Sequence, residues 1–117
     1  MKKSELSKLL HSLGIAVNEG ITSEGNKGKY PRIVYWPYIE IEKVASDETY
    51  TTVFTYQISM FSKTPRHEKF IELKKKLREA GYRPEFYHEY VENDPVFSKI
   101  WHTYFSLEIE DDTEVEA

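Results

Sequence analysis

Residues 50–61 constrain the fold of this chain more than any other segment. Aromatic or apolar residues recur at even positions and polar residues at odd positions: Tyr50, Phe54, Tyr56, Ile58 and Met60 against Thr51, Thr55, Gln57 and Ser59. Successive side chains of a β-strand point to opposite faces of a sheet, so this alternation predicts a strand with one buried and one solvated face. The chain must therefore build a sheet and cover one side of it.

Two segments carry the spacing of amphipathic helices. Residues 5–13 are predicted to be helical because leucines recur at the required spacing between a capping serine and a glycine: Ser4, Leu6, Leu9, Leu10, Leu13 and Gly14. Residues 64–81 are predicted to form a second helix, which starts with a capping threonine and a proline and carries one apolar stripe: Thr64, Pro65, Phe70, Leu73, Leu77, Ala80 and Gly81. These helices are the candidates for covering the sheet.

Three more segments are predicted to be strands, at residues 32–41, 83–91 and 100–109, because they are rich in β-branched and aromatic residues. Pro37 lies inside the first of them and has no amide hydrogen to donate, so this strand is expected at a sheet edge or with a bulge. The intervening residues 18–29, 44–48 and 92–98 have no such pattern and are predicted to be loops.

The element order is thus helix, strand, strand, helix, strand, strand. It predicts the α+β class, with a four-stranded, mainly antiparallel sheet and two helices packed on one face. A chain of 117 residues can bury one core but not a deep cofactor cleft. We therefore expect a single domain over residues 1–109. Residues 108–117 hold six acids and no base, so residues 110–117 are predicted to be an acidic, disordered tail.

Charge and composition narrow the class of function. The formal net charge is -4, but without the six acids of residues 108–117 the rest of the chain has 14 acids against 16 bases and is formally +2. Cysteine is absent, which excludes disulfides, thiolate zinc sites and iron-sulfur clusters. No apolar run is long enough for a signal peptide or a membrane-spanning helix, so no membrane partner is expected.

The sequence predicts no catalytic, cofactor-binding or metal-binding residues. Residues 25–29 contain two glycines but lack the spacing of a phosphate-binding loop, and no serine lies in a nucleophile elbow. His88 and His102 fall on adjacent predicted strands and are candidates to face each other. With Glu89 they would form a metal site, but strand alternation points Glu89 away from His88.

The second predicted helix and its flanks are rich in bases. Eight of them lie within residues 63–83: Lys63, Arg66, Lys69, Lys74, Lys75, Lys76, Arg78 and Arg83. A basic helix face beside tyrosines is one way to bind nucleic acid, and it is also typical of a solvated helix surface. The sequence leaves a small nucleic-acid-binding module, using residues 64–83, as an alternative function.

Several stretches together resemble a known family. They are Tyr30-Pro31-Arg32-Ile33-Val34-Tyr35, then Asp47-Glu48-Thr49-Tyr50, then Tyr56-Gln57-Ile58-Ser59-Met60-Phe61-Ser62-Lys63, and the pair Gly81-Tyr82 after the helix. In this arrangement the chain is similar, over about residues 4–110, to the small tail-terminator or tail-completion proteins of long-tailed bacteriophages and prophages. Residues 18–29 and the acidic tail are not part of the resemblance.

The resemblance implies a structural virion protein without enzymatic activity. Proteins of that family form hexameric rings that cap the tail tube and join it to the head connector, while DNA passes through the lumen without specific binding. It implies assembly in the host cytoplasm and a final location in the virion tail or neck. A neck or head-closure protein is the near alternative.

On this interpretation, the candidate interface residues are three aromatics of the predicted edge strand and three lysines of the loops: Tyr35, Trp36, Tyr38, Lys27, Lys29 and Lys43. Aromatic anchors dominate many interfaces, and an edge strand can pair across subunits. Burial in the core is the competing interpretation for each aromatic residue.

Overall fold

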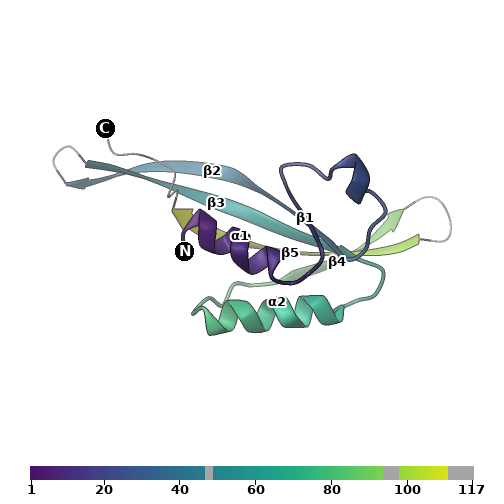
Figure 1. The fold of residues 1–117 in the computed structure, drawn as a ribbon. Helices are drawn as coiled ribbons and strands as arrows, with labels where there is room; N and C mark the ends of the chain where they lie inside the picture. The colour runs from purple at the N-terminus through teal and green to yellow at the C-terminus, as the bar shows by residue number, and fades with distance from the viewer. Residues whose placement is uncertain (47–48, 94–97, 111–117) are drawn as a thin grey trace.

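The computed structural model describes residues 1–46, 49–93 and 98–110. In chain order, its elements are helix α1 (Lys3–His11), strand β1 (Ala16–Glu19), the short 3-10 helix η1 (Glu24–Asn26), strands β2 (Arg32–Ser46) and β3 (Thr49–Ser62), helix α2 (Glu68–Glu79), and strands β4 (Tyr87–Asn93) and β5 (Ser98–Glu110) (Figure 1). Residues 111–117 of the predicted tail lie outside the described residues.

The sheet has five strands in the order β1-β2-β3-β5-β4, and it is mixed, because β1 runs parallel to β2 while the other neighbours are antiparallel. The α+β class is confirmed, but the predicted four-stranded, mainly antiparallel sheet is wrong. The additional strand is β1, which begins just before the predicted loop 18–29. Its residues Ala16–Glu19 do not alternate in polarity, and they form a strand because they pair with residues 32–35 of β2.

Both helices pack on one face of the sheet (Figure 1). The core between them and the sheet consists of buried apolar residues from α1, β2, β3, α2 and β5: Leu6, Leu10, Leu13, Ile33, Tyr35, Tyr56, Ile58, Met60, Phe70, Leu73, Leu77, Phe105, Leu107 and Ile109. Ile33 and Tyr35 of β2, the even positions of β3 and the odd positions of β5 supply the sheet side of this core. The opposite sheet face, which we call the open face, is covered by neither α1 nor α2.

The helices start and end at different residues from those expected. α1 begins at Lys3, and α2 begins only at Glu68, although the sequence predicted a start at Thr64. Arg66 has a φ of +45°, so a right-handed helix cannot run through this residue. The Nδ1 atom of His67 then caps α2 by accepting a hydrogen bond from the backbone N–H of Lys69 at 3.0 Å.

Strand β2 contains the bulge that Pro37 suggested. Its pairing with β3 shifts register between Pro37 and Ile39, which leaves Tyr38 as the extra residue. Before the bulge, Trp36 and the other even positions point to the open face; after it, Ile39 and the following odd positions do. The pairing of β1 ends at Tyr35, so β2 has a free outer edge from residue 36 onward among the described strands.

The far part of the β2–β3 hairpin projects from the rest of the molecule (Figure 1). Strand β5 reaches only as far as Val53, and residues 49–52 of β3 pair with β2 alone. We call residues 38–46 and 49–54 the arm. The molecule measures 58 × 29 × 22 Å, and its radius of gyration is 15.9 Å. A compact chain of this length has a radius of gyration of about 13 Å, so the arm makes the protein elongated.

Candidate functional site

The open face carries a continuous row of stacked planar groups that crosses four strands. Strand register aligns Arg32 of β2 with Phe61 of β3, Phe61 with His102 of β5, and Tyr104 of β5 with Tyr87 of β4. The guanidinium carbon of Arg32 lies 5.0 Å from the centroid of the Phe61 ring, and the Phe61 and His102 centroids are 4.7 Å apart. His102 stacks in turn on Tyr104 at 4.7 Å, and Tyr104 on Tyr87 at 5.4 Å.

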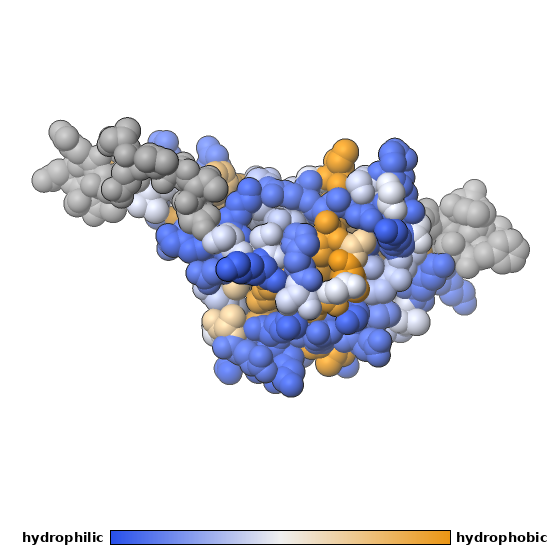
Figure 2. All heavy atoms as spheres, viewed as in Figure 1, coloured by the Kyte–Doolittle hydropathy of each residue, from blue (hydrophilic) through white to orange (hydrophobic). Residues whose placement is uncertain are grey.

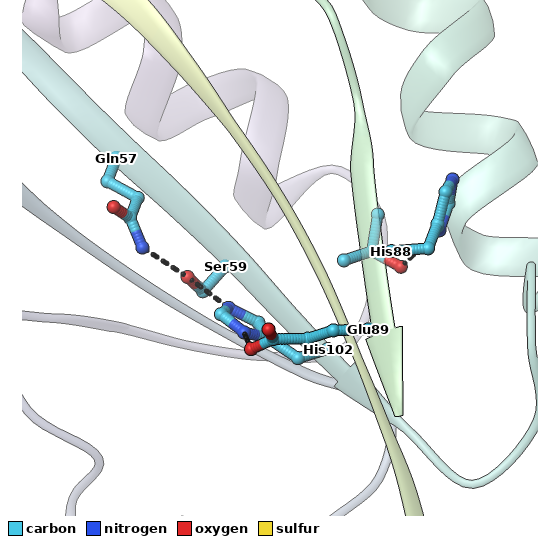
Figure 3. A network of polar contacts seen from close by, with 6 residues as sticks. Gln57, Ser59, His88, Glu89 and His102 are labelled. Carbon is cyan, nitrogen blue, oxygen red and sulfur yellow. Dashed lines mark hydrogen bonds and ion pairs between the residues drawn. The ribbon is translucent and has the colours of Figure 1, made fainter. Parts of the chain in front are cut away.

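A polar network lies beneath this row (Figure 3). His102 bonds through Nε2 to the hydroxyl oxygen of Ser59 at 2.7 Å and through Nδ1 to the carboxylate of Glu89 at 2.8 Å. Because a carboxylate accepts, Nδ1 carries the proton, and Nε2 of the neutral ring accepts from Ser59. The Gln57 amide donates to the Ser59 hydroxyl at 3.2 Å. Each polar group of His102 therefore has a partner.

These distances are those of a serine-histidine-carboxylate relay, but the exposure of its members differs from that of a hydrolase. Ser59 is 0% exposed, so its hydroxyl has no path to a substrate. Glu89, at the other end, has a side chain that is 54% exposed. A nucleophile must reach the reacting carbon, and Ser59 does not. The network connects β3, β5 and β4 and so stabilises the sheet.

His88 and His102 do not face each other, so this part of the sequence interpretation is wrong. His88 pairs with Thr103 and Glu89 with His102 in the strand register, which places the two imidazoles on opposite sheet faces (Figure 3). The predicted divergence of Glu89 from His88 is confirmed. Among the described residues, no group of three or more potential ligands could hold a metal ion.

His88 lies on the helix side of the sheet. Its Nδ1 atom is 2.9 Å from the hydroxyl oxygen of Thr103, and its ring packs edge-to-face against Phe70 of α2 with centroids 5.1 Å apart. This burial lowers the pKa of His88, and the positive charges of Arg66 and Lys74 lower it further. The neutral imidazole is therefore favoured in the folded protein.

The arm exposes apolar side chains. The exposed fractions are 52% for Tyr38, 42% for Ile39, 46% for Ile41 and 65% for Val44. Tyr38, Ile39 and Ile41 lie on the same side as the open face, because the hydroxyl of Tyr38 is 3.2 Å from that of Ser106 and the bulge turns the two isoleucines to that side. The arm therefore extends the open face with apolar surface.

The three aromatic candidates lie in different environments. Tyr35 is 4% exposed and belongs to the core, where its ring centroid is 5.9 Å from that of Tyr56. Trp36 is partly buried on the open face, opposite Gln57. Tyr38 is exposed at the base of the arm. The structure thus places Trp36 and Tyr38 together on one surface and Tyr35 on the other side of the sheet.

The three lysine candidates do not form a cluster with one another. Lys27 follows η1 and pairs with Glu24 at 2.7 Å, and Lys29 is exposed in the same loop. Lys43 lies far along the arm, opposite Thr51. The loop lysines and Lys43 are thus at separate ends of β2.

The sequence interpretation missed Arg32, Phe61, Tyr104 and Tyr87 as members of one surface. A signal was present in β5, where His102 and Tyr104 occupy even positions that should face solvent, while the odd positions supply the buried residues Phe105, Leu107 and Ile109. Two large rings at successive solvent-facing positions indicate that this sheet face is an interaction surface.

The bases of α2 lie on its outer side. Lys75 and Arg78 are exposed, and Lys69 pairs with Glu72 at 3.1 Å. In Figure 2, hydrophilic residues cover most of the lower surface, where α2 lies, and the hydrophobic residues form a strip through the middle of the view. This arrangement is that of a solvated helix surface.

Comparison with protein-family models finds no match, and no curated protein is similar in sequence. In the part of the chain that the structure describes, neither helix has the length and apolar character needed to cross a membrane.

Proposed function

We propose that this chain is a structural, non-enzymatic protein that assembles into a ring through its arm, in the manner of phage tail terminators. The observation that carries this proposal is the arm, which exposes Tyr38, Ile39, Ile41 and Val44, and whose tip projects past β5 from Glu42 onward. Exposed apolar side chains and unpaired strand edges are stabilised by pairing with another chain. A second copy or a virion partner would supply that pairing.

The free edges of the sheet support repeated contacts between copies. Among the strands that the structure describes, none pairs with the outer edge of β2 from residue 36 onward, and β4 is the edge strand on the other side of the sheet. A contact between two different surfaces repeats from copy to copy and closes into a ring when the rotation permits. We propose a hexamer with the tail-tube protein on one side, the head connector on the other and DNA in the lumen, formed in the host cytoplasm and kept in the virion.

A neck or head-closure protein would use the same arm, so gene neighbours distinguish the two. Genes for tail-tube and head-completion proteins support a tail terminator, and a regulatory operon contradicts a virion role. A nucleic-acid-binding module that uses α2 predicts instead a gel shift that weakens steeply with salt.

Paired substitutions on the arm and on a helix test the proposal. Ile41→Glu places a charge on the arm, and Ile71→Glu is a matched control on α2, because the two isoleucines are 46% and 42% exposed. We expect Ile41→Glu to abolish ring formation, as measured by light scattering and negative-stain imaging. It should also abolish binding to tail tubes made from the neighbouring tube gene, whereas Ile71→Glu should leave both unchanged. Failure of the unaltered chain to bind those tubes would contradict the proposal.

A further inference from the structure

Arg32 has an unusual environment at one end of the stacked row. Its guanidinium carbon lies 4.6 Å from the centroid of the Tyr30 ring and 5.0 Å from that of Phe61, so it is close to both rings. The ammonium nitrogen of Lys63 lies 5.4 Å from the centroid of the same Tyr30 ring. Two cations are thus gathered around one tyrosine.

Neither cation has an acidic partner among the described residues. The ion pairs found there join Lys2, Lys3, Lys27 and Lys69 to carboxylates, and none includes Arg32 or Lys63. The Nε and Nη1 atoms of Arg32 are buried and have no hydrogen-bond partner in the described part of the chain. An unsatisfied buried donor is costly, and for a charged group the cost is larger, because ring contacts replace only part of the lost hydration. The described residues supply no anion to Arg32 or Lys63.

The neighbouring rings favour a carboxylate over a nucleobase. Phe61 has Arg32 and His102 as stacking partners, and His102 and Tyr104 each stack on two rings. Their faces are therefore occupied, and the row offers mainly its ring edges to a ligand. Nucleobases bind by stacking on free ring faces, whereas the positive edge of an aromatic ring attracts oxygen.

We propose that Tyr30, Arg32 and Lys63 form a carboxylate-binding site, and that its ligand is the acidic segment 111–116 of a second copy of this chain. Four of these six residues are acids and none is a base: Asp111, Asp112, Glu114 and Glu116. The segment follows β5 directly and matches the charge of the site. This inference rests on the proposed self-assembly, because the ligand comes from another copy.

The distance along the sheet disfavours the same molecule's own segment as the ligand. Arg32 aligns with His102 through Phe61, whereas the segment starts after Glu110, eight residues farther along β5. Eight residues of strand span about 26 Å. Glu116 is six residues beyond Glu110 and reaches at most about 21 Å back from it. Even with the lengths of the Arg32 and Glu116 side chains added, the same molecule's segment would have to run almost fully extended back along the sheet, which costs conformational entropy. A neighbouring copy can supply the carboxylate without this constraint.

The test is an NMR titration of the isotope-labelled full chain with a peptide of residues 110–117. A control peptide carries the amide in place of each acid. We expect the acidic peptide to shift the signals of Tyr30, Arg32 and Phe61, and 0.5 M salt to weaken the binding. Arg32→Gln should reduce the affinity about tenfold or more, as expected for the loss of a charge-assisted hydrogen bond.

Two further variants keep the test decisive. Lys63→Gln changes an exposed side chain and should weaken binding about threefold even if Arg32→Gln fails to fold. Arg78→Gln is the matched control on α2 and should change nothing. The proposal would be overturned if the amide peptide bound equally well or if the signal shifts were centred on α2. It would also be overturned if Arg78→Gln had an equal effect, or if a single-stranded oligonucleotide bound more strongly at the site.

The outcome also distinguishes a failure of the carboxylate-binding site from a failure of the proposed ring assembly. Peptide binding at Arg32 by a chain that neither forms rings nor binds tail tubes would leave the site standing and contradict the proposed function. Rings that form while the peptide fails to bind would contradict the site alone.

Discussion

The ring of Phe61 lies parallel to the imidazole of His102, with an angle of 8° between the planes and 4.7 Å between the centroids. The two residues are directly opposite each other on β3 and β5. This contact holds His102 in place while its two nitrogens bond to Ser59 and Glu89. Stacking and hydrogen bonding therefore act together on one side chain, whose exposed fraction is only 13%.

His102→Ala is expected to lower the free energy of unfolding by about 2–4 kcal/mol, because it removes the stacking and leaves the buried hydroxyl of Ser59 without this partner. His102→Phe keeps the stacking and should lose about 1–3 kcal/mol. Urea denaturation measures both. Glu89→Gln retains an acceptor on an exposed side chain and should cost less than about 1 kcal/mol; a cost as large as that of His102→Ala would show that the network is not organised around His102.

Stability should depend on pH through His88. Burial and nearby cations lower the pKa of His88 in the folded chain. Below about pH 6.5, His88 is therefore protonated in the unfolded chain but remains neutral in the folded chain. The free energy of unfolding should therefore fall as the pH drops from about 6.5 toward the lowered pKa. Above about pH 7.5, His88 should contribute nothing to the pH dependence of that free energy. Urea denaturation at several pH values, compared between the unaltered chain and His88→Asn, measures this. An equal slope for both chains would contradict the assignment.

Tyr35 and Tyr38 are close in sequence but should respond differently to truncation. Tyr35→Ala empties a core position and is expected to cost about 3–5 kcal/mol. Tyr38→Ala removes an exposed ring and one exposed hydrogen bond to Ser106, and should cost less than about 1 kcal/mol. Thermal and urea denaturation of the isolated chain provide the comparison. Similar losses would mean that the arm contributes to the core of a single copy.

Gly81 follows α2 with a φ of +92°, a conformation that residues with a side chain rarely adopt. Gly81→Ala is expected to destabilise the chain by about 1–2 kcal/mol through backbone strain, since the space around its added Cβ is empty. Gly25→Ala is the matched control, because that site is equally open and needs no positive φ. It should change the unfolding free energy by less than about 1 kcal/mol.

The sequence predicted the elements whose patterns are local. The alternation in residues 50–61 and the leucine spacing near the N-terminus each need only neighbouring residues, and β3 and α1 were predicted close to their observed bounds. Strand β1 was missed because it is held by parallel pairing with β2, a contact across the loop that follows it. Pairing of this kind leaves little trace in so short a segment.

The stacked row could not be predicted from the sequence for a related reason. Its formation depends on the register of β3 against β5, and helix α2 and strand β4 separate those strands in the sequence. Register is set by packing on the buried face, not by a pattern within either strand. Phe61 and His102 were each visible in the sequence, but nothing indicated that they were neighbours.

The bulge at Tyr38 determines which residues of the arm face which side of the sheet. The single extra residue puts Ile39 and Ile41 on the open-face side and turns Glu40 and Glu42 to the other. If Tyr38 instead paired in register opposite Thr55, Ile39 and Ile41 would turn to the helix side, and Glu40 and Glu42 would replace them on the open-face side. Deleting Tyr38 would remove the bulge and leave Ile39 opposite Thr55. The bulge thus governs the chemical character of the arm, and one residue inserted after Ile39 and paired in register would turn Ile41 away from the open-face side and bring Glu40 and Glu42 onto it.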